Sequence, residues 1–292
     1  MTLVLSVLEQ GLIYGIMAMG VYITYKILDF PDMTVDGSFP MGAAITAIMI
    51  SKDMNPLITL PICFGAGILV GICTGIIHVK LGVRDLLSGI IMFTGLYSVN
   101  LRIAGRANLP IYNKKTIFEN SLMDLLPEAV APYRKLILIL ILVLLVKYIL
   151  DWYLRTRSGY LLRAVGDNET IVTAMGIDKG FVKILGLAIA NGMVCLSGCI
   201  FAQQQRFFDL SMGTGTVVIG LASVIMGTSL LKNVTFLRAT SAVLVGSLLY
   251  KACVAVAIRY MDSRDLKLVT AVLFLIILVV GRERKRKVKA NA

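Results

Sequence analysis

Apolar residues gather in nine runs along the chain, and short polar stretches separate these runs. The runs cover roughly residues 3–24, 38–51, 57–79, 86–102, 135–153, 181–204, 214–231, 237–257 and 266–281. A helix needs about 20 apolar residues to cross a bilayer, so the pattern predicts an all-α integral membrane protein with about nine helical segments. The shorter runs at 38–51 and 214–231 predict helices that begin or end inside the membrane.

Composition agrees with this fold class. Hydrophobic residues make up 58% of the 292 residues, charged residues only 16%, and the mean hydropathy is +0.84. These values exclude the two soluble domains that the length alone would suggest. The first run is too long for the apolar core of a signal peptide and has no basic segment before it, so we expect it to be a retained membrane span.

The distribution of positive charge indicates how the chain is oriented in the membrane. The formal net charge is +12, and much of it lies at the ends of the apolar runs and in the tail at 282–292. Basic residues beside membrane spans favour the cytoplasmic side, which explains the charge better than nucleic-acid binding does. With the tail in the cytoplasm, loop 154–180 is also cytoplasmic, whereas the N-terminus and the long loop 103–133 are external.

Two pairs of similar segments indicate an internal repeat. DMTVDGS from Asp32 resembles DLSMGTG from Asp209, and RDLLSGIIMF from Arg84 resembles RDLKLVTAVLF from Arg264, with offsets of 177 and 180 residues. Within a single transmembrane domain, 1–292, we therefore expect repeat one at 1–102, a linking span at 134–153 and repeat two at 181–281. Corresponding segments are displaced by five spans, which gives the two repeats opposite orientations, as in many transporters.

Glycines at four-residue spacing occur on two of the runs. Gly11 and Gly15 lie on the first run, and Gly67, Gly71 and Gly75 lie on the third. Small residues at this spacing let helix backbones approach closely in lipid, so we expect both faces to be packing interfaces.

Acidic residues lie in or beside the two broken segments. Charged groups inside a membrane are costly and are usually functional. The candidates for the solute pathway are Asp32, Thr34, Asp36, Asp209 and Ser211. The alternative is that the aspartates cap half-helices together with the two hydroxyl residues, because Asp, Ser and Thr beside a glycine turn commonly begin helices. From the sequence both interpretations remain open.

A polar stretch, RTRSGYLLRAVGDNETIVTAMGIDKG, occupies most of loop 154–180 between two strongly apolar runs. Asp167 and Asn168 predict the start of a short helix, and Gly176 predicts its end. One side of this helix is expected to carry Ile171, Val172 and Met175, and its outer side Glu169 and Thr173. A helix of about two turns is marginal alone in water, so it docks either on a partner or on the protein's own surface.

Motifs for catalysis or metal binding do not occur in the sequence. There is no GxxxxGK[ST] phosphate-binding motif, the only histidine is His78, and the five cysteines lie in apolar runs without metal-ligand spacing. We therefore expect no enzyme activity and no cofactor bound by this chain. A permease that works with a separate ATP-hydrolysing chain and a secondary transporter that works alone both fit, and the polar helix favours the permease.

The run SGYLLRAVGDNETIVTAMGI resembles the cytoplasmic coupling segment of the branched-chain amino acid and sugar permease family of ATP-binding-cassette (ABC) importers. GLIYGIMAMGVYITYKILDFPDMTVDGSFPMGAAITA and GILVGICTGIIHVKLGVRDLLSG are also similar to that family. The resemblance implies that the loop binds a groove of the ATP-binding subunit and couples ATP hydrolysis to movement of the membrane helices. The residues implicated are Gly159, Arg163, Ala164, Gly166, Asp167, Asn168, Ile171, Met175 and Gly176.

The same resemblance implies partners, location and substrate class. It implies two copies of an ATP-binding subunit that carry ATP and Mg²⁺, an extracytoplasmic substrate-binding protein or lipoprotein near loop 103–133, a permease homodimer, and the plasma membrane of a prokaryote. LDFPDMTVDGSF departs from both the amino acid and the sugar patterns of the family. It is closer to a branch linked to uptake of tryptophan, tyrosine or similar amino acids. We expect an aromatic or branched-chain amino acid, with a sugar or nucleoside as the alternative.

Overall fold

Long helices make up most of the described chain. The computed structural model describes residues 2–119, 133–231 and 238–260, with scattered positions between 268 and 279. Within these residues, seven helices are long and apolar enough to cross a membrane, which confirms the all-α fold class. They are α1 (Thr2–Val21) with its continuation η1 (Tyr22–Ile27), α3 (Thr59–Val79), α4 (Asp85–Ala104), α6 (Arg134–Tyr153), α9 (Lys179–Gln205), η4 (Leu210–Gly213) with α10 (Thr216–Leu230), and α11 (Ala239–Tyr260).

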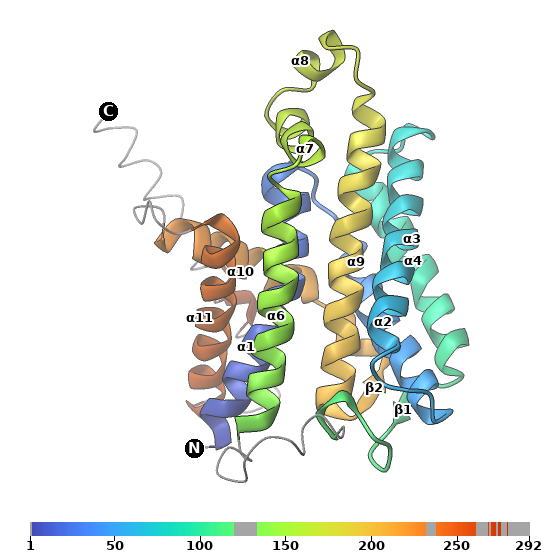
Figure 1. The fold of residues 1–292 in the computed structure, drawn as a ribbon, viewed down its shortest axis with the longest axis vertical. Helices are drawn as coiled ribbons and strands as arrows, with labels where there is room; N and C mark the ends of the chain where they lie inside the picture. Colours follow the sequence, from blue (N-terminus) through green and yellow to red (C-terminus); the bar gives the residue numbers. More distant parts are fainter. Residues whose placement is uncertain are drawn as a thin grey trace.

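Helix α9 lies at the centre of the bundle and packs against α1, α2 (Val35–Ser51) and α3 (Figure 1). The protein itself buries 72% of its membrane-crossing window, compared with 22% for α4 and for α6. Polar side chains on α9 are therefore shielded from lipid, whereas α4 and α6 lie at the outside of the bundle.

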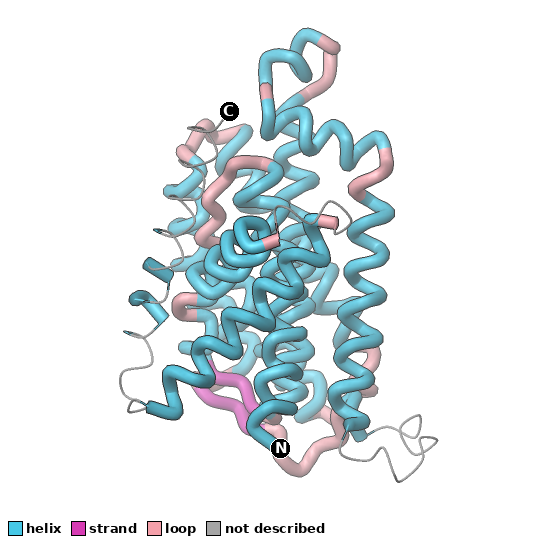
Figure 2. Tube along the Cα trace, turned by 90° about the vertical axis from the view of Figure 1, so that its left-hand side faces the viewer, coloured by secondary structure: helices cyan, strands magenta, loops and turns pink. Residues whose placement is uncertain are grey.

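The two ends of the molecule differ in structure. At the end with the N-terminus, β1 (Asn108–Pro110) pairs antiparallel with β2 (Phe207–Asp209), and η2 (Ile117–Glu119) follows in the same loop (Figure 1). At the other end, α7 (Arg157–Asp167) and α8 (Glu169–Ala174) protrude from the bundle (Figure 2). The sequence pattern does not predict the small β-ladder, because it depends on pairing of Asn108 with Asp209, 101 residues away.

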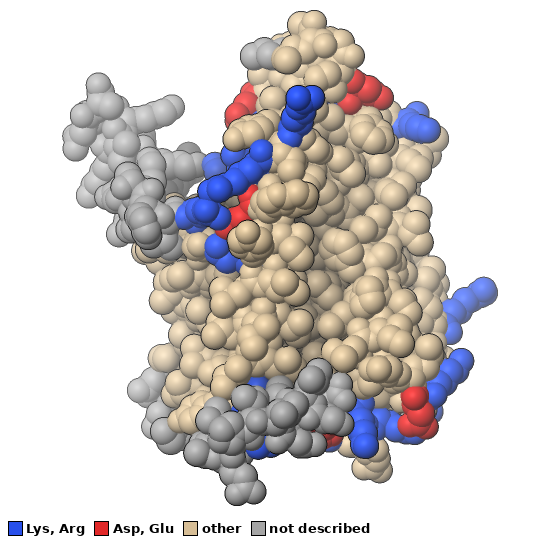
Figure 3. All heavy atoms as spheres, viewed as in Figure 1, with Lys and Arg blue, Asp and Glu red and all other residues tan. Residues whose placement is uncertain are grey.

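Charged side chains are distributed as expected for a membrane protein. On the face shown in Figure 3, most Lys, Arg, Asp and Glu side chains lie toward the two ends, with a broad region between them in which charged side chains are sparse. A bilayer favours this distribution because charges at the level of its hydrocarbon core are costly.

Close helix packing occurs where the glycines predict it. A Cβ built on Gly71 of α3 would lie 2.6 Å from the Cα of Ala188 on α9, and one built on Gly11 of α1 would lie 3.2 Å from the Cα of Leu248 on α11. The two contacts are related by an offset of 177 residues: Gly11 corresponds to Ala188, and Gly71 corresponds to Leu248. The α1–α11 and α9–α3 crossings therefore use equivalent positions of the two predicted repeats.

Chain organisation differs from the prediction in the first half of the polar loop. Residues 157–167 form helix α7, although the sequence analysis assigned no helix there, and Asp167 ends this helix instead of beginning the next. Helix α7 has small and apolar residues at helical spacing, with Gly159, Leu162 and Val165 buried. The pattern is short, and Arg163 lies within it. The ninth predicted segment, 266–281, the tail 282–292 and residues 120–132 lie almost wholly outside the described residues.

Candidate functional site

The segment between η1 and α2 carries a buried aspartate. Asp32 is 4% exposed. Its Oδ1 accepts a hydrogen bond from the backbone N–H of Thr34 at 2.8 Å, and its Oδ2 accepts one from the Asn191 side chain at 2.8 Å. The first bond is a local turn of the kind expected before a helix, and the second fixes this segment to α9.

Further polar contacts join α2, α3 and α9 around this aspartate. The hydroxyls of Thr34 and Thr74 are 3.1 Å apart, and Ser38 donates to the side-chain oxygen of Asn191 at 2.6 Å. All four side chains are fully buried. Asn191 was not among the predicted site residues, although an amide in the middle of the apolar run 181–204 is a sequence signal for interhelical hydrogen bonding in a membrane.

Asp36 caps a helix of the other predicted repeat. Its Oδ1 accepts hydrogen bonds from the Val217 backbone N–H at 2.8 Å and from the Thr216 hydroxyl at 2.9 Å, and its Oδ2 accepts one from the Gly215 N–H at 3.1 Å. Backbone N–H groups at the start of a helix lack partners within the helix. Asp36 therefore satisfies the N-terminus of α10 from a distant part of the chain.

Asp209 makes the same local turn as Asp32. Its Oδ1 accepts a hydrogen bond from the Ser211 N–H at 2.8 Å, and its Oδ2 accepts one from the Asn108 side chain at 3.3 Å. The Asp32–Thr34 and Asp209–Ser211 turns are again 177 residues apart. All three aspartates thus have capping roles, while contact with a solute remains a prediction.

A recess brings three of the predicted pathway residues together. It has a volume of about 350 Å³ and lies between α4, the start of α2 and the segment that joins α9 to α10. We call it the α4 recess; it is lined by Asp36, Phe93, Tyr97, Ala107, Asp209, Leu210, Ser211 and Thr214. Asp32 and Thr34 do not line it. Its aromatic residues were not predicted, because hydropathy treats them like any other apolar residue of a span.

The first half of the predicted coupling segment packs tightly against the bundle. A Cβ on Gly159 would lie 2.5 Å from the carbonyl oxygen of Tyr153 in α6, and one on Gly166 would lie 1.6 Å from the carbonyl oxygen of Ile27 in η1. Only glycine permits such close backbone contact at these positions. The Ala164 side chain packs against the main core, while Arg163 is exposed.

Local signals for α8 are confirmed. The side-chain oxygen of Asn168 accepts a hydrogen bond from the Thr170 N–H at 3.0 Å, and Gly176 has a φ of +74°, as expected for the residue after a helix. Asn168 and Asp167 are exposed, and so is Met175, by 66%. The side chain of Ile171 lies outside the described part of the structure.

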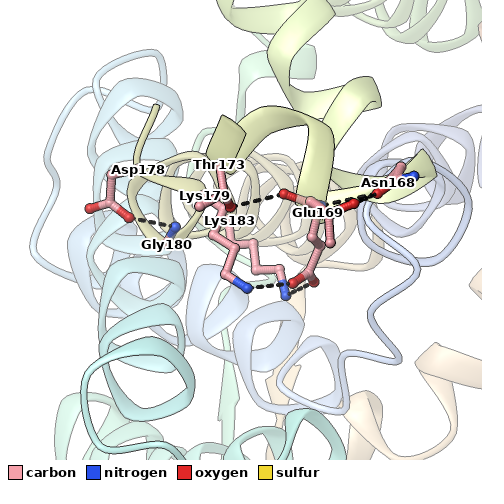
Figure 4. Close-up of polar contacts among 8 residues, drawn as sticks. Asn168, Glu169, Thr173, Asp178, Lys179, Gly180 and Lys183 are labelled. Atoms are coloured by element: carbon pink, nitrogen blue, oxygen red, sulfur yellow. Dashed lines mark hydrogen bonds and ion pairs between the residues drawn. The ribbon is translucent and has the colours of Figure 1, made fainter. Parts of the chain in front are cut away.

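One side of α8 docks on the protein itself. Val172 is fully buried in the main core, and Glu169 pairs with Lys179 at 2.9 Å and Lys183 at 2.5 Å, both on α9 (Figure 4). Hydrogen bonds from Lys183 and then Lys179 lower the pKa of Glu169 below its usual value. The expectation that Glu169 faces outward was therefore wrong, because it did not take into account the lysines of the following helix.

Residues 2–119, 133–231 and 238–260 contain no group of three or more His, Cys, Asp or Glu side chains that could hold a metal ion. None of the five cysteines forms a disulfide, and all five lie in the described part of the chain.

Seven apolar helices, polar groups at two breaks and an amphipathic segment outside the bundle define an integral membrane transport protein. The chain belongs to the family described as "Branched-chain amino acid transport system / permease component", whose profile matches residues 3–281. This confirms the resemblance noted in the sequence. Members are permease subunits of ABC transport systems, so the chain is a transport subunit and not an enzyme, and it is a multi-pass protein of the bacterial plasma membrane.

Individual relatives agree with this assignment. The chain is 42% identical, over 99% of its length and 95% of the relative's, to the tyrosine transport system permease protein of Clostridioides difficile. It is 24% identical over 77% of its length, and 68% of the relative's, to the ribose import permease protein of Haemophilus influenzae. The solved structure of PsaBC from Streptococcus pneumoniae in complex with Fab has a similar fold, with a TM-score of 0.53, 14% identity, and coverage of 98% of this chain and 94% of that one.

Proposed function

We propose that this permease forms the pathway by which an ABC importer takes up an aromatic or branched-chain amino acid, delivered by an external substrate-binding protein. The observation that carries the proposal is the 42% identity, across 99% of the chain, to a tyrosine transport system permease. A sugar or nucleoside is the alternative solute, and the more distant ribose import permeases favour it.

Reconstituted uptake tests this proposal. The permease, its ATP-binding subunit and its substrate-binding protein would be placed in proteoliposomes, and uptake of radiolabelled tyrosine, leucine and ribose would be compared with and without ATP. We expect ATP-dependent uptake of tyrosine or leucine. Uptake of ribose alone would favour the sugar alternative, and uptake without the ATP-binding subunit under an ion gradient would indicate a secondary transporter.

The segment α7–α8 is proposed to be the docking element for the ATP-binding subunit. ABC permeases work with such a subunit, which carries ATP and Mg²⁺, and this chain has exposed side chains on α7 and α8, including Arg163 and Met175. The buried side of both helices is bound to α6, η1 and α9. A force applied to the exposed side would therefore be transmitted to the central helix α9.

Two copies of the permease, each in contact with one of two ATP-binding subunits, are proposed to form the importer. The inverted repeat is part of this proposal, and the equivalent α1–α11 and α9–α3 contacts support it. Crosslinking of single cysteines at equivalent positions of two copies measures the stoichiometry. Full ATP-driven uptake by an importer that contains one permease copy would contradict the homodimer.

A further inference from the structure

The α4 recess contains negative charge that no described side chain neutralises. Asp36 and Asp209 both line it, and neither forms an ion pair with any residue that the structure describes. Their hydrogen-bond donors are backbone N–H groups, hydroxyls and the Asn108 amide, all of them neutral. The recess therefore favours a cationic ligand group.

Both carboxylates retain capacity to accept further hydrogen bonds. A carboxylate has about four lone-pair sites. Among the residues that the structure describes, the Oδ2 of Asp36 accepts a hydrogen bond only from the Gly215 N–H, and the Oδ2 of Asp209 accepts one only from the Asn108 amide. A ligand ammonium can thus bind without displacing the caps of α10 and η4.

An aromatic surface lies on the α4 side of the same recess. Phe93 and Tyr97 both line it and are one helical turn apart, so they lie on the same face of α4. Tyr97 is 53% exposed. Aromatic rings provide contact area for apolar or aromatic groups and also attract cations to their faces.

A buried amide joins α4 to the start of α2. Asn100 follows Tyr97 on α4, is 1% exposed, and donates a hydrogen bond to the carbonyl oxygen of Gly37, the residue after Asp36. Its own side-chain oxygen has no donor among the described residues. Asn100 is not among the residues that line the recess, so its contribution there is to hold α4 against the start of α2 next to Asp36.

We propose that the α4 recess is a recognition site within the permease for a solute that has a protonated amine and an apolar side chain. Asp36 and Asp209 attract the ammonium group, and Phe93 and Tyr97 contact the side chain. The inference rests on the proposed function, and it adds that the permease itself selects the solute. An aromatic or branched-chain amino acid meets both requirements, whereas a neutral sugar does not meet the charge requirement.

Thiol modification at Thr214 tests the site without the selectivity of the substrate-binding protein. Thr214 lines the recess and is exposed. Thr214→Cys would be made in a variant whose five native cysteines are replaced and whose uptake has been verified. This permease would be reconstituted with its ATP-binding subunit but without the substrate-binding protein. Rates of modification by a cationic and an anionic methanethiosulfonate would then be measured. We expect the cationic reagent to react faster, by about two- to fivefold beyond the ratio at Tyr112→Cys, an exposed position outside the recess.

Protection by ligands identifies the groups that are recognised. Tyrosine and tyramine, which share an amine, should slow modification of the Thr214→Cys variant by about two- to fivefold, whereas 3-(4-hydroxyphenyl)propionate, which has no amine, should not. Tyr97→Ala should reduce this protection. Val99→Ala, an exposed position on the same helix outside the recess, should not.

Results that differ from these expectations would contradict different parts of the inference. Equal protection by the propionate contradicts recognition of the ammonium, and equal effects of Tyr97→Ala and Val99→Ala contradict the aromatic contact. If neither reagent modifies Thr214→Cys, or no ligand protects it in an importer that takes up tyrosine, the recess is not a recognition site although the proposed function stands. Uptake of ribose and protection by ribose would overturn both.

Discussion

Asp36 stabilises a helix that begins far from it in the sequence. Its carboxylate accepts hydrogen bonds from residues 215, 216 and 217 at the start of α10. An Asp near a glycine turn could be predicted to cap a helix, but sequence reasoning points to the local helix, α2. The helix that Asp36 caps can be identified only from the fold, which brings the start of α2 close to the start of α10.

Replacing this carboxylate should destabilise the bundle. Asp36→Ala leaves the N–H groups of Gly215 and Val217 without an acceptor, which costs about 1–3 kcal/mol. Unfolding in detergent micelles would measure the change. Asp53→Asn is the control, since Asp53 lies in an exposed ion pair and Asn tolerates its left-handed backbone conformation; it should change stability by less than about 1 kcal/mol. Equal stability of both variants would show that α10 is capped in another way.

Gly166 is required for contact between the coupling segment and the bundle. A Cβ there would overlap the Ile27 carbonyl at 1.6 Å, and backbone cannot move away as a side chain can. Gly166→Ala should therefore displace α7 and reduce ATP-driven uptake by about tenfold or more, because a shift of about 1 Å can uncouple a positioned group. Gly95→Ala, which has open space around it, should leave uptake unchanged. Normal uptake by Gly166→Ala would show that α7 does not transmit motion through η1.

Helix α8 has one side bound to the protein and one side exposed, and the two sides predict different phenotypes. Val172→Asp places a charge in the core and should lower folding yield. Met175→Asp should leave folding intact but weaken binding of the ATP-binding subunit by about tenfold, because interfaces concentrate their energy in a few apolar contacts. Copurification and uptake would be measured together. Thr173→Asp is the control for added charge, and an equal effect there would exclude a specific contact by Met175.

The ion pairs that attach α8 to α9 should weaken at acidic pH. Ion pairs with Lys183 and Lys179 lower the pKa of Glu169 in the folded protein. The pKa of a glutamate in the unfolded chain is about 4.3. Because the pKa of Glu169 is lower in the folded protein, its ion pairs stabilise the fold fully above this value, and their contribution is lost as the pH falls through the pKa of the folded state. Amide hydrogen exchange in α8, compared after correction for intrinsic rates, should therefore accelerate below about pH 4. Glu169→Gln should remove this dependence, and an unchanged profile in the variant would assign it to another group.

How well the elements could be predicted depends on the range of the interactions that form them. Asn168 and Gly176 act on the adjacent backbone, and the spans follow from local hydropathy, so these features were predicted. The Asn191 contact with Asp32 spans 159 residues, and the α4 recess combines residues of four separate segments. No local pattern contains this information. Helix α7 was missed for another reason, since its buried stripe has only three members, one of them a glycine, and Arg163 lies between the other two.

The whole molecule has two chemically different ends, and its predicted orientation can be measured. Loop 103–133 is expected outside and the α7–α8 segment in the cytoplasm. In the cysteine-free background, Asn113→Cys should react with an impermeant maleimide in intact spheroplasts. Tyr160→Cys, which is exposed on α7, should react only after permeabilisation. The reverse pattern would invert the topology and would place the α4 recess on the cytoplasmic side.

The cap that Asp36 places on α10 also has a consequence for biosynthesis. The acceptor is translated 179 to 181 residues before its donors, which corresponds to roughly 10 to 35 s at typical rates of synthesis. A free carboxylate can remain hydrated while it waits, whereas free N–H groups at the start of an apolar helix would reach the membrane without a partner. The order of the two halves thus lets the newly inserted α10 find its cap already present, and a chain with its halves exchanged would lose this advantage during membrane insertion.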